Sequence, residues 1–165
     1  MALALAVTVA NLRSPTSAVN MRTALDELLR SREGRGKLYE SRYQSCDEFT
    51  LTPTKGEAAA LRVIVPHSPG EVVTIWAGRG TVFEVPEGGR RYTTSAQLGE
   101  ILTICGAVMD QGLEESVVFD GGELLRGVGT VRLPGASSPT KVQWGRLSLR
   151  PFSKKEQSST NYEPW

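Results

Sequence analysis

The chain has 165 residues, of which 39% are hydrophobic and 22% are charged, and its formal net charge at pH 7 is +1. This is the composition of an ordinary soluble globular protein, and the length suits one domain better than two. No apolar run approaches the roughly 20 residues of a transmembrane helix, and Cys46 and Cys105 are too few for a disulfide framework. We therefore expect a cytoplasmic protein without a membrane span.

The first 13 residues, MALALAVTVANLR, contain a short apolar stretch. A signal peptide carries positive charge before its apolar stretch, whereas no Lys or Arg precedes this one. We interpret the segment as a first strand or a helical turn, with a cleaved signal as the alternative.

A first helix is predicted after Ser14, which can cap it, and Pro15, which suits the first helical position. Gly34 and Gly36 end it. Its apolar stripe consists of Met21, Leu25, Leu28 and Leu29.

Four runs rich in Val, Ile, Phe, Trp and Thr follow, each bounded by Pro or Gly, which predicts strands. They span residues 43–53, 58–66, 71–77 and 81–86. Between the last two runs, Gly78 and Gly80 are free to take positive φ in a tight hairpin turn.

A second helix is predicted from Thr94, which forms a capping box with Gln97, to about Met109 or Gln111, with Gly112 as a left-handed cap. Its apolar stripe, expected to be buried, is Leu98, Ile101, Leu102, Cys105 and Val108.

Three further strands are predicted, within residues 116–120, 123–133 and 141–150. The order of helix, four strands, helix and three strands suits a single α+β domain over residues 1–152, with a mostly antiparallel sheet and about two helices packed on one face. Residues 153–165 are expected to form a loose polar tail from which Tyr162 and Trp165 pack back.

Catalytic chemistry finds little support in the residues. His67 is the single histidine, and its place in VPHSPG is typical of a turn. A lone histidine builds no common zinc site, no serine-nucleophile motif is present, and Cys105 falls on an apolar helix face. We expect no enzyme activity, metal or cofactor; the alternative is a small hydrolase or transferase that uses His67 and a carboxylate.

The glycine-rich pieces lie between predicted strands, which favours hairpin turns over a phosphate-binding loop. Arg90 and Arg91 could contact nucleic acid, but no pattern of basic and aromatic residues supports a nucleic-acid surface. We expect no nucleic-acid partner.

Charge is divided along the chain. Residues 84–123 hold eight acids and two arginines, net −6, whereas residues 124–165 hold seven bases and two acids, net +5. The two segments could neutralise each other, the acids could form a solvated face, or they could dock a basic protein partner. Under the docking hypothesis, the contact residues are Asp110, Glu114, Glu115, Asp120 and Glu123.

Residues 93–131, TTSAQLGEILTICGAVMDQGLEESVVFDGGELLRGVGTV, resemble the succession of helix, glycine, acidic pair, strand and glycine turn in small immunity proteins of bacterial polymorphic toxins. The resemblance implies an α+β binding protein that occludes the active site of a basic toxin, with the same five acids as contacts. A structural or secretion-adaptor module is a further alternative.

Overall fold

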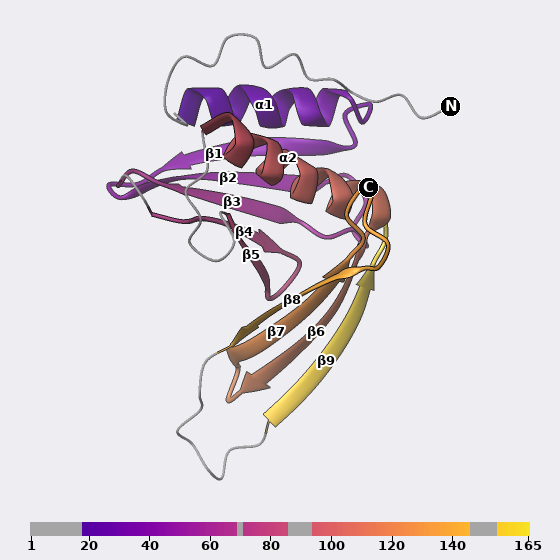
Figure 1. Cartoon of the computed structure of the whole chain (residues 1–165). Coiled ribbons are helices and arrows are strands. Elements are labelled where there is room, and N and C mark those ends of the chain that lie inside the picture. The colour runs from indigo at the N-terminus through magenta and orange to yellow at the C-terminus, as the bar shows by residue number, and fades with distance from the viewer. Residues whose placement is uncertain (1–17, 69–70, 86–93, 146–154) are drawn as a thin grey trace.

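The computed structural model describes residues 18–68, 71–85, 94–145 and 155–165. The N-terminal apolar segment, Ser14, Pro15 and the arginine pair Arg90 and Arg91 lie outside the described residues. Two helices and two antiparallel sheets make up the described fold, which is α+β as predicted (Figure 1). No helix in this part of the chain is both long and apolar enough to cross a bilayer.

The first sheet is a five-stranded meander in the order β1-β2-β3-β4-β5. Its strands are β1 (Gly36–Arg42), β2 (Cys46–Pro53), β3 (Leu61–Pro66), β4 (Val73–Ala77) and β5 (Thr81–Val85). Along β2 and β3 every second side chain is buried, so the apolar residues share one face of the sheet. The four predicted strands are confirmed. Strand β1 was not predicted.

Both helices lie on the buried face of this sheet (Figure 1). Helix α1 (Ala18–Arg30) buries Met21, Leu25 and Leu29, and helix α2 (Thr94–Gln111) buries Leu98, Ile101, Cys105 and Val108. These residues join the sheet in one hydrophobic core. Leu102 is only partly buried, so the prediction that it is a full core residue is wrong.

The two ends of α2 are held differently. Gly112 has a φ of +75°, which confirms the predicted left-handed cap. The side-chain amide of Gln97 donates to the carbonyl of Val85, at 3.1 Å, and so ties the start of α2 to the end of β5. This contact differs from the return bond of a capping box.

The second sheet has the order β8-β7-β6-β9. Its strands are β6 (Leu113–Asp120), β7 (Glu123–Val131), β8 (Thr140–Gly145) and β9 (Lys155–Tyr162). In Figure 1 it extends from the first sheet away from the helices. The predicted loose tail is wrong, because β9 pairs with β6 along eight residues. The predicted return of Trp165 is confirmed: its side chain is buried, and the indole N–H donates to the carbonyl of Ala59 at 2.9 Å.

The two sheets meet where the β4–β5 turn packs on β7. Gly78 takes a φ of +64° in this turn, as predicted, but Gly80 does not have positive φ. The reason for glycine on β7 is close approach: a Cβ at Gly127 would collide with the carbonyl of Gly80, and one at Gly129 would collide with the side chain of Thr81. Gly127 and Gly129 therefore allow the two sheets to pack closely against each other.

Candidate functional site

Glu115 is an internal anchor and is not available to a partner. Only 4% of the residue is exposed. Its carboxylate accepts hydrogen bonds from the backbone N–H of Arg79 (2.9 Å) and Gly80 (2.7 Å), and from the hydroxyls of Thr81 (2.8 Å) and Tyr162 (3.1 Å). These bonds fix the β4–β5 turn and β9 to β6. The expectation that Glu115 is an exposed contact residue is therefore wrong.

The environment of Glu115 also affects Tyr162. Burial of the phenol, followed by the nearby charge of Glu115 and the hydrogen bond to it, raises the pKa of Tyr162 to about 12. The phenol is therefore neutral and serves as a donor to the carboxylate.

The other acids predicted for docking do not share one surface. Asp120 is buried. Asp110, at the end of α2, accepts two hydrogen bonds from the guanidinium of Arg32, at 2.8 and 2.6 Å. Glu114 and Glu123 are exposed, but β6 separates them: Glu114 stands at its start, and Glu123 is paired with its last residue. At 3.3–3.4 Å per residue, these positions are about 20 Å apart.

The reason for this dispersal is the two-residue period of a strand. Successive side chains of β6 point to opposite faces, so Glu114 and Glu115 cannot both meet the same partner. The single acidic edge expected from residues 110–123 does not exist.

His67 joins a strand end to a turn. Its Nδ1 lies 3.2 Å from the carbonyl oxygen of Gln44, and its Nε2 lies 3.2 Å from a carboxylate oxygen of Asp47. The backbone N–H of His67 donates to the carbonyl of Ser45 at 2.9 Å. These contacts hold the end of β3 against the β1–β2 turn. The turn predicted for VPHSPG itself runs into residues 69–70, which lie outside the described residues.

Cys105 offers no nucleophile. Burial raises its thiol pKa to about 12, and the reactive form of cysteine is the thiolate. Among the residues described, no group of three or more His, Cys, Asp or Glu is placed to hold a metal ion.

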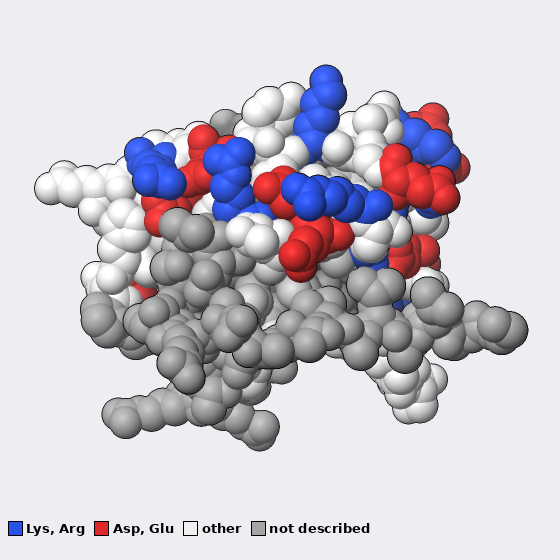
Figure 2. All heavy atoms as spheres, turned by 90° about the horizontal axis from the view of Figure 1, so that it is seen from above, with Lys and Arg blue, Asp and Glu red and all other residues white. Residues whose placement is uncertain are grey.

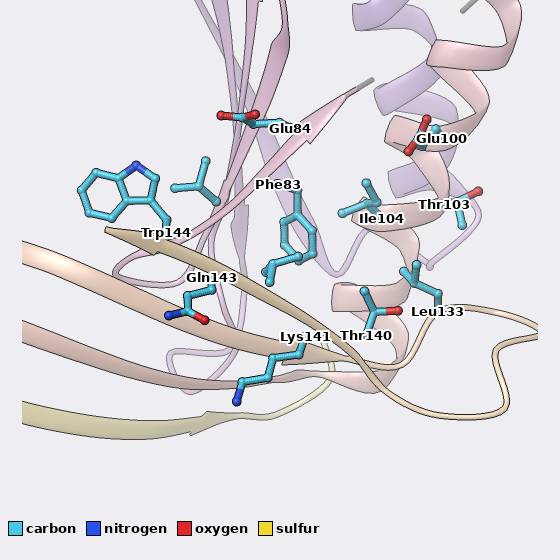
Figure 3. Close-up of a pocket in the computed structure, with 12 residues that line it drawn as sticks. Phe83, Glu84, Glu100, Thr103, Ile104, Leu133, Thr140, Lys141, Gln143 and Trp144 are labelled. Carbon is cyan, nitrogen blue, oxygen red and sulfur yellow. The ribbon is translucent and has the colours of Figure 1, made fainter. Parts of the chain in front are cut away.

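A pocket of about 490 Å³ lies between α2, β5 and β8 (Figure 3). Phe83 and Ile104 form its apolar wall, and Glu84 and Lys141 stand among its polar residues. His67 does not line it. The pocket therefore does not join His67 to a carboxylate, which is the arrangement that the hydrolase alternative needs.

The helix side of the molecule carries both signs of charge. Seen from above the helices, blue basic and red acidic side chains interleave over the described part of this face (Figure 2). Glu40 accepts hydrogen bonds from Arg42 at 2.7 Å and Arg22 at 2.6 Å, and these bonds lower its pKa. Within the described part of this face, basic and acidic side chains alternate and do not form a strong field of one sign.

The opposite face of the first sheet, hereafter the open face, has a different composition. Strand register places Tyr39, Thr50, Arg62 and Trp76 in one row across β1 to β4. Tyr39 is 54% exposed, Arg62 is exposed and Trp76 is half-buried. We call Tyr39, Arg62 and Trp76 the Tyr–Arg–Trp row.

Aromatic contacts hold two members of the row, Arg62 and Trp76, in place. The guanidinium carbon of Arg62 lies 5.4 Å from the centre of the Trp76 ring, a cation–π contact. The ring of Trp144, on β8, meets Trp76 edge to face at 5.8 Å between centroids. Sequence reasoning missed this row. The available signal was that Arg62 and Trp76 each stand between two apolar residues of a predicted strand, whereas Tyr39 stands between Leu38 and Glu40.

The chain matches no protein-family model, and neither a curated protein nor a solved structure is significantly similar to it.

Proposed function

We propose that the chain is a non-enzymatic binding protein whose partner is another protein. The observation that carries this proposal is the Tyr–Arg–Trp row on the open face. Tyrosine, tryptophan and arginine are the residues that dominate binding energy at protein interfaces. Because Arg62 is already held over Trp76, less side-chain freedom is lost when a partner binds.

The shape of this surface favours a macromolecule over a small ligand. The row runs across four adjacent strands, and three inter-strand spacings of about 4.8 Å give a width of about 14 Å. Small molecules prefer concave pockets that enclose most of their surface. A row of side chains on a sheet face suits a partner with an extended complementary surface.

We further propose that the partner is a bacterial toxin whose active site this protein covers. The support is the resemblance of residues 93–131 to immunity proteins. A basic partner would find acids on the open face as well, because Glu48 and Glu84 lie in the cross-strand row next to the Tyr–Arg–Trp row, with Ile64 and Thr74 between them. In this proposal Glu48 and Glu84 contact the basic partner, in place of the acids of residues 110–123.

The proposal is tested by protection of cells. Where the gene next to this one encodes a toxin domain, that domain is expressed in bacteria together with the wild-type chain or with the Tyr39→Ala/Arg62→Ala variant. We expect the wild type to restore growth and the variant to fail while remaining folded. The matched control is Glu27→Ala, at an exposed position on the helix side. Equal protection by the variant, or no protection by the wild type, would contradict the proposal.

A further inference from the structure

The pocket between α2, β5 and β8 lies where the edges of the two sheets meet (Figure 3). Strand β5 ends the order of the first sheet, β8 ends that of the second, and the two strands contact each other without pairing. Consecutive residues of both strands line the pocket, 82–84 of β5 and 140–144 of β8. Because successive residues of a strand direct their N–H and C=O groups to opposite sides, each wall includes backbone groups that point away from the strand's own sheet. An extended peptide in the pocket would therefore find backbone partners.

The side chains at the base of the pocket are apolar. Phe83 and Ile104 are buried, and Leu133, Val142 and Trp144 are partly exposed. Leu133 and Val142 also pack against the hydrophobic core. An apolar group that enters the pocket leaves water and meets two aromatic rings, those of Phe83 and Trp144, which favour a third aromatic ring as the occupant.

The pocket adjoins the open face at the end of the Tyr–Arg–Trp row. Strand register places Val82 opposite Trp76 and Glu84 opposite Thr74, and both Val82 and Glu84 line the pocket. Trp144, another lining residue, meets Trp76 edge to face. A protein that covers the row therefore reaches the pocket next.

The charges at the pocket favour a cation beside the aromatic ring. Glu84 lines it from β5 and is exposed, and Glu100 lines it from α2. Lys141 also lines the pocket, but in Figure 3 its side chain extends away from both carboxylates. It alternates along β8 with Val142 and Trp144, so its side chain lies on the other face of the strand. None of the ion pairs among the described residues involves Glu84.

We propose that this pocket receives an extended segment of the partner protein, with an aromatic side chain inside it and a lysine or arginine beside that side chain. The ring contacts Phe83 and Trp144, the cation meets Glu84, and the backbone of the segment pairs with a strand edge. The inference rests on the proposed function, because the segment belongs to the protein bound at the open face. A free aromatic amine would lack the backbone, and the partly exposed walls would leave much of it in water, whereas small ligands prefer sites that enclose them.

Titration with a synthetic peptide tests the site without a toxin. The probe is the capped peptide acetyl-Gly-Phe-Lys-Gly-amide, followed by NMR of the wild-type chain. We expect shifts at the backbone amide of Phe83 and the indole N–H of Trp144. The indole of Trp165, which is buried and bonded to a carbonyl, is the unaffected reference. A peptide with glycine in place of phenylalanine should bind at least about tenfold more weakly, and one with glutamate in place of lysine about threefold more weakly at low salt.

Three results of this titration would overturn the proposal. One is the absence of shifts at the pocket. The second is equal binding of the peptides with and without the aromatic ring. The third is binding of phenethylamine as tightly as the peptide, because this small amine has the ring and the cation without the backbone.

Two substitutions test the pocket from the side of the protein. Val142→Phe should fill it and weaken peptide binding at least about tenfold. The matched control is Val128→Phe, since Val128 is also partly exposed but shares the other face of the second sheet with Gln143. Glu84→Gln, at an exposed position, should weaken binding about threefold and remove most of its dependence on salt. Wild-type binding by both Val142→Phe and Glu84→Gln would contradict the site.

This inference and the proposed function fail in different ways. Tyr39 and Arg62 do not line the pocket, so Tyr39→Ala/Arg62→Ala should bind the peptide as the wild type does and lose affinity for the partner protein. A partner that loses affinity with this double variant but binds Val142→Phe normally would overturn the pocket inference alone. Normal peptide binding by the wild type, together with normal partner binding by the double variant, would support the pocket and overturn the row.

Discussion

The hydroxyl of Tyr162 in β9 donates a hydrogen bond of 3.1 Å to the carboxylate of Glu115 in β6. The same carboxylate binds two backbone N–H groups of the β4–β5 turn. A single buried acid therefore connects the two sheets.

Replacing Glu115 should destabilise the fold strongly. Glu115→Ala leaves buried donors without an acceptor, and each such donor costs about 1–3 kcal/mol, so we expect a loss of ~3 kcal/mol or more. Glu114→Ala, one residue away on the other face, should change the free energy of unfolding by about 0.5 kcal/mol or less. Urea unfolding of both variants measures the difference. Similar losses in the two would show that Glu115 is not an anchor.

Stability should fall at high pH through Tyr162. Its pKa in the folded protein is raised to about 12, whereas an unperturbed tyrosine has a pKa of about 10. As pH rises, the unfolded chain loses the proton first, so the contribution present below about pH 10 is lost between about pH 10 and 12. Denaturant unfolding over this range should show a shallower decline for Tyr162→Phe than for the wild type. Parallel declines would contradict this account.

Replacing Ile101 by alanine should destabilise the fold more than replacing Leu102 by alanine. Ile101 is fully buried, so Ile101→Ala should lower the free energy of unfolding by ~2–5 kcal/mol. Leu102 is only partly buried, and Leu102→Ala should cost less. Thermal or urea unfolding compares them, and a larger loss at Leu102 would mean that α2 presents a different face to the core.

His67 should be dispensable for binding. Its ring contacts a carbonyl and a carboxylate at a turn, and it does not line the pocket. His67→Ala should therefore still protect cells in the toxin assay. If protection disappeared while the variant stayed folded and still bound the toxin, the enzyme alternative would regain support.

The sequence predicts the core of the fold well because burial leaves a periodic pattern. Leu98, Ile101, Cys105 and Val108 recur at helical spacing, and all are buried. Both strands that escaped prediction, β1 and β9, are edge strands with no fully buried residue. A polar strand that is held mainly by backbone pairing has little hydrophobic alternation, so the sequence predicts a tail where β9 lies.

The candidate site was harder to predict than the core. Five acids close together in the sequence suggested one surface, but a strand alternates its faces and a tertiary contact buries Glu115. The Tyr–Arg–Trp row shows the reverse case, in which residues far apart in the sequence share one surface. Its members come from three strands, and Tyr39 and Trp76 are 37 residues apart in the chain. Only strand register brings them together.

The central claim is that the open face binds a protein through the Tyr–Arg–Trp row. Where the gene next to this one encodes a toxin domain, calorimetric titration of the purified chain with that purified domain tests it most directly. At about 2 kcal/mol or more for each interface hot spot, Tyr39→Ala/Arg62→Ala should weaken binding at least about 100-fold, while Glu114→Ala should bind as the wild type does. A double variant that binds with wild-type affinity would contradict the claim.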